Sequence, residues 1–198
     1  MNIKVIAFDF GGVLGTEADA WSSTFERVLG SAGLTHEEMD KIWEKHWPKL
    51  KIGKEDISEY WKDAAKKQNI DFKKVQYLYN NSITINQGML DLVKSLKGKY
   101  KLVILSNDSI DWMDAKIKRF KLLDIFYKVY CSGNIGIAKP DVEIFKYVLK
   151  DLEIKPEELL FVDNQENNIE AANALGINSI LFKNQKDLEE NLKVFFQS

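Results

Sequence analysis

The sequence is poor in cysteine, histidine and proline, and its charges almost cancel. Its 198 residues include one cysteine, two histidines and three prolines, and the formal net charge is -2. A single cysteine excludes a disulfide within the chain, so nothing points to a secreted, disulfide-stabilised protein. A nucleic-acid surface would carry an excess of basic residues, which this chain lacks. We therefore expect a cytoplasmic protein that does not bind nucleic acid.

Long apolar runs are also missing, since none reaches the roughly 20 residues of a membrane-spanning helix. We expect no membrane partner. The first four residues lead directly into an apolar strand pattern rather than a signal peptide. The lone Cys131 lies in the apolar run 127–131, which favours a core position over a nucleophile. His36 and His46 fall away from the strand ends, and we expect neither to have a chemical role.

Five short apolar runs are present, each typical of a strand buried on both faces. They occupy residues 5–8, 102–105, 129–131, 159–162 and 179–182. Apolar residues at helical spacing predict helices over 89–96, 142–152, 167–175 and 184–198. Strands that alternate with helices indicate an α/β fold with a Rossmann-like, doubly wound parallel sheet.

The interval from residue 17 to residue 81 breaks this alternation. It shows helical patterns without a convincing strand and is too long for a loop. We expect an inserted helical cap over 17–81 and a Rossmann-like core made of 1–16 and 82–198. The sequence Thr35-His36-Glu37-Glu38 predicts a capped helix start inside this cap. The cap also holds a group of large aromatic residues, for which we favour a place in the cap's own core over contacts with substrate: Trp21, Trp43, Trp47, Tyr60 and Trp61.

Polar residues follow four of the five strand runs. In open parallel sheets, ligands bind beyond the carboxyl ends of the strands. The residues at these solvent-facing tips are Asp9 with Gly11 and Gly12, Ser106 with Asn107, Lys139, and Asp163 with Asn164. Each tip alone is typical of a turn or a helix cap. Their order at successive strand ends predicts one crevice that combines all of them.

This combination of groups suits phosphoryl transfer. Asp9 can attack phosphorus and form an aspartyl phosphate. Backbone N–H groups around Gly11 and Gly12 can hold the phosphoryl oxygens, because glycine permits close approach. Ser106 can donate another hydrogen bond. Lys139 can neutralise the developing charge, keep Asp9 ionised and lie within salt-bridge reach of it.

A metal ion would complete such a site. A hard cation with oxygen ligands, most simply Mg²⁺, would bridge Asp9, the Gly11 carbonyl and the pair Asp163 and Asn164. We assign Asn107, together with the hydroxyl beside it, to substrate binding. The expected substrate is a small phosphorylated molecule.

Four stretches of the chain together resemble the haloacid dehalogenase superfamily of hydrolases with a helical cap after the first strand. They are residues 5–14, 105–107, 136–141 and 161–164, with Asn168, Ala171, Ala172 and Gly176 behind the last stretch. The resemblance covers essentially the whole core. It implies a Rossmann-like fold, a nucleophilic Asp9, phosphate contacts from Ser106 and Lys139, and Mg²⁺ as cofactor. Most members are phosphatases, and some are dehalogenases or mutases.

Two positions depart from the family pattern. The family usually has an aspartate that acts as general acid and base where this chain has Gly11, and such help is worth roughly 10²–10⁴-fold in rate. It commonly has an aspartate metal ligand where this chain has Asn164, whose amide oxygen can still bind a hard cation without adding charge. Three interpretations stay open: a phosphatase that can be slow, a degenerate member that binds a phosphorylated ligand or partner without turnover, and a dehalogenase. We favour the phosphatase.

Overall fold

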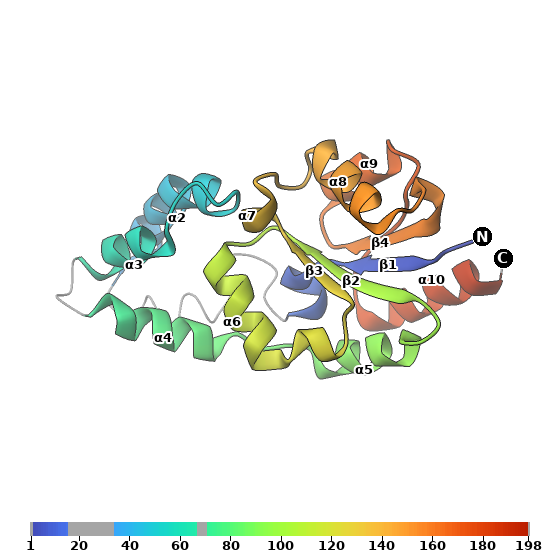
Figure 1. Ribbon diagram of the computed structural model, residues 1–198. Helices are drawn as coiled ribbons and strands as arrows, with labels where there is room; N and C mark the ends of the chain where they lie inside the picture. Colours follow the sequence, from blue (N-terminus) through green and yellow to red (C-terminus); the bar gives the residue numbers. More distant parts are fainter. Residues whose placement is uncertain (1, 16–33, 67–70, 198) are drawn as a thin grey trace.

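The computed structural model describes residues 2–15, 34–66 and 71–197, and a five-stranded sheet lies at its centre (Figure 1). The strands are β1 (Val5–Phe8), β2 (Lys101–Ser106), β3 (Lys128–Cys131), β4 (Leu159–Asp163) and β5 (Asn178–Leu181). Their spatial order is β3-β2-β1-β4-β5, and every neighbouring pair is parallel. The chain thus builds outward from β1 in both directions. This doubly wound arrangement confirms the predicted α/β fold class.

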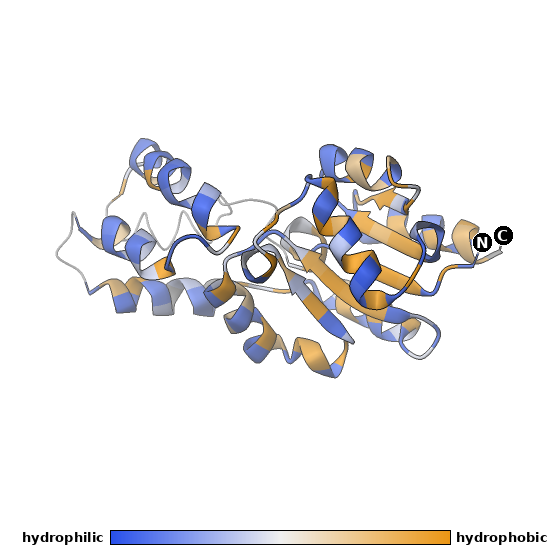
Figure 2. Ribbon diagram, turned by 45° about the horizontal axis from the view of Figure 1, so that its top comes forward, coloured by the Kyte–Doolittle hydropathy of each residue, from blue (hydrophilic) through white to orange (hydrophobic). Residues whose placement is uncertain are grey.

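Side chains alternate between the two faces of the sheet and form two separate core layers. In β1, Ile6 and Phe8 pack on one face, while Val5 and Ala7 pack on the other. The first face is covered by α5 (Gln87–Leu96), α6 (Ile110–Phe120) and α10 (Gln185–Gln197), and the second by α8 (Val142–Leu152) and α9 (Glu166–Asn173). Figure 2 shows the strands as an apolar layer between these helices. Burial on both faces explains why the strand runs are continuously apolar.

The predicted elements mostly agree with the structure. The predicted strands end within one residue of the observed ones, and α8 has the predicted bounds. The predicted helices do not include α6 or the short α7 (Ser132–Ile135). The sequence of α6 does carry a helical pattern, because Ile110, Met113, Ile117 and Phe120 recur at helical spacing, and Ile117 and Phe120 pack against the core.

Three further helices pack together on the side where the strands end (Figure 1). They are α2 (His36–Leu50), α3 (Ile57–Ala65) and α4 (Phe72–Ser82). Thr35 and Glu38 form the predicted capping box at the start of α2, with the Thr35 N–H donating to Glu38 Oε2 over 3.0 Å. Trp21 lies outside the described residues. No helix in the described parts of the chain is long and apolar enough to cross a membrane.

Neither histidine of this helical group lies at the carboxyl ends of the strands. His36 is exposed at the start of α2. His46 is buried, and its two ring nitrogens contact Glu55 and Asp63, the latter over 2.9 Å. It therefore ties α2 to the segment that leads into α3 and to α3 itself. This is a structural role.

Cys131 is buried at the end of β3, as predicted. Burial raises the pKa of its thiol to about 12, with the nearby Asp108 carboxylate acting in the same direction. The thiol is neutral at physiological pH and is therefore a poor nucleophile.

Candidate active site

Asp9 stands immediately after β1 and is held there by the backbone. Its N–H donates to the Val162 carbonyl over 2.9 Å, which extends the pairing of β1 with β4 by one residue. A single helical turn, η1 (Phe10–Leu14), follows. Its dihedral angles are not helical at Gly11 (φ -67°, ψ 120°) and Gly12 (φ 72°). The Phe10 N–H donates to Asp9 Oδ1 over 2.7 Å, so the turn orients one carboxylate oxygen.

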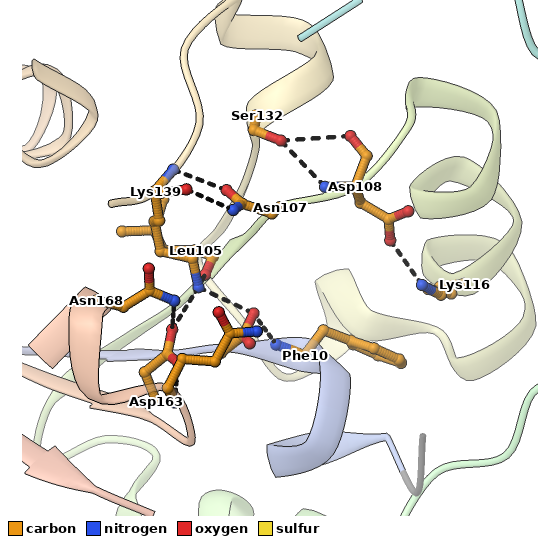
Figure 3. Close-up of polar contacts among 11 residues, drawn as sticks. Phe10, Leu105, Asn107, Asp108, Lys116, Ser132, Lys139, Asp163 and Asn168 are labelled. Atoms are coloured by element: carbon orange, nitrogen blue, oxygen red, sulfur yellow. Dashed lines mark hydrogen bonds and ion pairs between the residues drawn. The ribbon is translucent and has the colours of Figure 1, made fainter. Parts of the chain in front are cut away.

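The Lys139 ammonium lies where three strand ends meet (Figure 3). It donates to Asp163 Oδ2 over 2.6 Å and to the Leu105 carbonyl over 2.9 Å. It also lies 3.1 Å from Asp9 Oδ1. The expected proximity of Lys139 to Asp9 is thereby confirmed, although 130 positions separate them in the sequence. Lys139 is only 2% exposed, so this cation is held among oxygens rather than in water.

Asn107 fixes the backbone that carries this lysine. Its Nδ2 donates to the Lys139 carbonyl over 2.8 Å, and its Oδ1 accepts from the Lys139 N–H over 2.8 Å (Figure 3). These contacts show a positioning role for Asn107. Its assignment to substrate binding stays a prediction, although the residue also lines the cavity described below.

Asp163 and Asn164 have different surroundings. Asp163 is fully buried, and its two oxygens accept from Lys139, from Asn168 Nδ2 over 3.0 Å and from the Gln165 N–H over 2.8 Å. The Asn164 amide oxygen is buried as well, but it has no hydrogen-bond partner among the described residues. Buried polar groups are normally paired, so an orphaned oxygen beside Asp163 indicates a position where a ligand can bind.

The charge of Asp9 reflects competing effects. The pKa of its carboxyl is raised from 3.8 to about 6 as the net result of these effects. Burial is the largest and raises the pKa, the Lys139 ammonium lowers it, and the nearby Asp163 carboxylate raises it. Burial outweighs the lysine, yet a pKa of about 6 leaves most of Asp9 ionised at neutral pH. Our expectation of a solvent-facing tip was wrong, because Asp9 is only 6% exposed.

A cavity of about 400 Å³ opens in front of these groups. One end is polar and is lined by Asp9, Gly11, Ser106, Asn107, Lys139 and Asn168. The other end is lined by large side chains from α2, α4, α6 and the residue after α2: Trp43, Trp47, Lys51, Tyr79, Trp112 and Lys116. A volume of this size is typical of a site for a small molecule.

The aromatic residues of the helical group fall into two sets. Tyr60 and Trp61 are fully buried and form the expected internal core. Trp43 and Trp47 are half-buried, and they pack against the hydrophobic core while also lining the cavity.

Sequence reasoning also missed a partly buried ion pair at the cavity. Asp108 Oδ2 lies 2.6 Å from the Lys116 ammonium (Figure 3), and both residues line the cavity. Burial raises the pKa of the Asp108 carboxyl, against the effect of Lys116. The position of Asp108 just past β2 was a usable signal. Lys116 lies eight residues further on, in α6, which the predicted helices do not include.

Comparison with known proteins fits this arrangement. The family model of the haloacid dehalogenase-like hydrolases matches residues 6–182. The chain belongs to this family. This hydrolase is 29% identical over 210 residues to the D-ribitol-5-phosphate phosphatase of Bacteroides thetaiotaomicron, a match that covers 99% of this chain and 100% of the relative. It is 26% identical over 204 residues to drimenol cyclase of Aspergillus calidoustus, covering 99% of this chain but only 37% of that longer protein.

A solved structure is similar over the same extent. A HAD-family enzyme from Bacteroides thetaiotaomicron, crystallised with magnesium and inorganic phosphate, matches this hydrolase with a TM-score of 0.78 at 26% identity. The match covers 91% of this chain and 94% of that one. The similarity therefore includes both the sheet and most of the chain outside it.

Proposed function

We propose that this hydrolase is a phosphatase that releases inorganic phosphate from a small phosphorylated metabolite, with Asp9 as the nucleophile. The observation that carries the proposal is the 3.1 Å approach of the Lys139 ammonium to Asp9 Oδ1 at the polar end of the cavity. A carboxylate and a buried cation at one point suit a phosphate ester, which needs a nucleophile and positive charge together. Similarity to a D-ribitol-5-phosphate phosphatase supports the same reaction class.

The reaction proceeds in two steps. An Asp9 carboxylate oxygen attacks phosphorus, and the alcohol leaves with the electron pair of the broken P–O bond. Lys139 offsets negative charge on the transferred group, while the Ser106 hydroxyl and the backbone N–H groups of Gly11 and Gly12 donate to its oxygens. Water then attacks the phosphorus of phospho-Asp9 and frees phosphate. Gly11 has no side chain to move a proton, so the leaving oxygen takes its proton from water.

The residues present fit Mg²⁺. The described residues contain no group of three or more His, Cys, Asp or Glu side chains that could hold a metal. Mg²⁺ does not need one, because it commonly binds through one or two carboxylates, with waters and substrate phosphate completing its shell. Asp9, the Gly11 carbonyl and the orphaned oxygen of Asn164 would hold the ion. When bound, Mg²⁺ supplies positive charge to the phosphoryl oxygens.

Asn164 is the better candidate for direct metal contact than Asp163. The Asp163 oxygens already accept three hydrogen bonds, whereas the Asn164 oxygen accepts none from the described residues. Asp163 would then act through its charge and through its hold on Lys139. The magnesium and phosphate in the related Bacteroides structure support a metal-dependent reaction.

We further propose that residues 17–81 form a cap over a core made of residues 1–16 and 82–198. Trp43 and Trp47 support this division, because they come from α2 and yet line the cavity beside Asp9. Closing a cap over bound substrate would exclude bulk water from the phosphoryl group. A cytoplasmic location also stays part of the proposal, since the chain has one cysteine, buried and reduced, and needs no oxidising compartment.

Phosphate release from p-nitrophenyl phosphate and a panel of metabolites, with and without Mg²⁺, tests this function. We expect release that depends on Mg²⁺. Gly11 and Asn164 favour the second candidate function, binding of a phosphorylated ligand without turnover. Tight binding of inorganic phosphate with no release from any ester would establish that alternative. Halide release from 2-haloacids, with no phosphate release, would instead identify a dehalogenase.

A further inference from the structure

Three nearly parallel indole rings from α2 and α6 line the cavity. Trp43 stacks on Trp47 with ring centroids 4.4 Å apart and an interplanar angle of 17°. Trp43 and Trp112 are inclined by 11° at 6.2 Å, and Trp47 and Trp112 by 28° at 6.3 Å. All three residues line the cavity. We call this surface the tryptophan wall.

The wall is fixed from behind and accessible in front. Trp112 is 2% exposed and packs edge-on against the fully buried Trp61, with centroids 5.9 Å apart. Trp43 and Trp47 are only half-buried, so part of their surface stays accessible. A rigid aromatic surface of this kind binds flat apolar groups at little conformational cost.

The hydrogen-bonding groups of the wall do not suit a polyol. Among the described cavity-lining residues of α2, α4 and the position after α2, the tryptophans and Lys51 can only donate, and Tyr79 alone has a side-chain oxygen. The Trp112 N–H is buried with no hydrogen-bond partner in the described structure. Each hydroxyl of a polyol needs an acceptor for its own proton, and unpaired buried donors are costly.

Charge in the cavity points the same way. Its two lining carboxylates, Asp9 and Asp108, are paired with Lys139 and Lys116. The described part of the helical group contributes Lys51 and no carboxylate. Among the described residues, each carboxylate that lines the cavity is therefore already engaged by a lysine.

We propose that the preferred substrate is a phosphate monoester of an alcohol with a flat apolar body, which lies against the tryptophan wall while its phosphate faces Asp9. This rests on the phosphatase function proposed above. An aromatic ring and an unsaturated hydrocarbon chain share the required chemistry. The cavity of about 400 Å³ limits the substrate to a small molecule.

Three primary alkyl esters test the proposal: 2-naphthylmethyl phosphate, farnesyl monophosphate and D-ribitol 5-phosphate. All three lose an unactivated alkoxide, so differences in kcat/KM report recognition of the alcohol rather than leaving-group chemistry. We expect at least one apolar ester to exceed ribitol 5-phosphate by about tenfold or more in kcat/KM. The better of the two apolar esters distinguishes an aromatic from a chain-like substrate. Equal values, or a preference for ribitol 5-phosphate, would overturn the inference.

Two variants localise the effect. Trp47→Leu keeps an apolar side chain but removes a flat face, so it should lower the apolar-to-ribitol ratio of kcat/KM by about tenfold. Tyr77→Leu is the matched control, because Tyr77 is 67% exposed on α4 and does not line the cavity; its ratio should stay unchanged. An unchanged ratio in folded Trp47→Leu also contradicts the proposal. If Trp47→Leu does not fold, the comparison of esters on the natural chain decides alone. Release of phosphate from none of the esters, nor from p-nitrophenyl phosphate, would refute the phosphatase function itself.

Discussion

Replacing Gly53 by alanine should disturb the contact between the α2–α3 connection and the sheet domain. Gly53 has a φ of +66°, and a Cβ at this position would lie 2.2 Å from the Gly133 carbonyl oxygen and 3.2 Å from its carbon. Both atoms belong to the backbone, so no side chain can rotate away. The left-handed conformation costs alanine about 1–2 kcal/mol. Relieving the overlap adds about 1–3 kcal/mol, as for other overpacked sites.

The consequence should be loss of activity more than loss of the sheet. Gly133 precedes the loop that carries Lys139, so a displaced Gly133 shifts the ammonium relative to Asp9. Alternatively, the overlap is relieved because the cap moves away from the sheet, which opens the cavity. Either outcome predicts a fall of about tenfold or more in kcat/KM on p-nitrophenyl phosphate.

Gly98→Ala is the matched control for this substitution. Gly98 has a similar φ of +86°, but a Cβ there meets no atom within 4 Å. It shares the backbone cost and lacks the overlap. We therefore expect a lowered Tm in both variants and a lowered kcat/KM only in Gly53→Ala. Equal kcat/KM values in the two variants would refute the reasoning.

Three further predictions concern the polar end of the cavity. Asp9→Asn should abolish turnover. Without metal it should also raise the free energy of unfolding at pH 7 by up to about 3 kcal/mol. The reason is that a pKa raised from 3.8 to about 6 makes the ionised carboxylate unfavourable in the folded state. Urea unfolding should show this difference growing as pH rises from 4 to 7 and vanishing below pH 4; a less stable variant at pH 7 would contradict it. Lys139→Ala should abolish turnover and lower the free energy of unfolding by about 3 kcal/mol or more, since it leaves Asp9 and Asp163 buried without their cation. The control is Lys146→Ala, which removes an ion pair whose lysine is 51% exposed. It should change the free energy of unfolding little in the same assay. Because Gly11 cannot protonate a leaving group, kcat/KM should be far higher for aryl than for alkyl phosphates. A folded Gly11→Asp variant should lower the aryl-to-alkyl ratio of kcat/KM. An unchanged ratio would count against the explanation that the chain lacks a proton donor at position 11.

The topology of the site could be predicted from the sequence because it depends on few features. Continuous apolar runs identified the strands, and parallel strands bring the residues after them to one edge. Asp9, Lys139 and Asp163 therefore meet, as expected. The burial of Asp9 was not predictable in this way, since it depends on how the loops close over the strand end.

Contacts between side chains were much harder to predict from the sequence. The two hydrogen bonds from Asn107 to the Lys139 backbone depend on the path of a loop that has no periodic pattern. Likewise, Trp43 and Trp47 are four residues apart on one helix face, which is equally compatible with a buried core and with a cavity wall. Only the packing of α2 against its neighbours distinguishes these two possibilities.

Trapping the phosphorylated protein tests the central claim most directly. The protein would be mixed with p-nitrophenyl phosphate and Mg²⁺, quenched in acid during turnover, and mapped by peptide mass spectrometry. Because Gly11 offers no carboxylate to activate the attacking water, the intermediate should break down slowly and accumulate. The account predicts one phosphoryl group on the peptide that contains Asp9, and none in Asp9→Asn. Sustained phosphate release that persists in Asp9→Asn, or phosphorylation of a different residue, would contradict it.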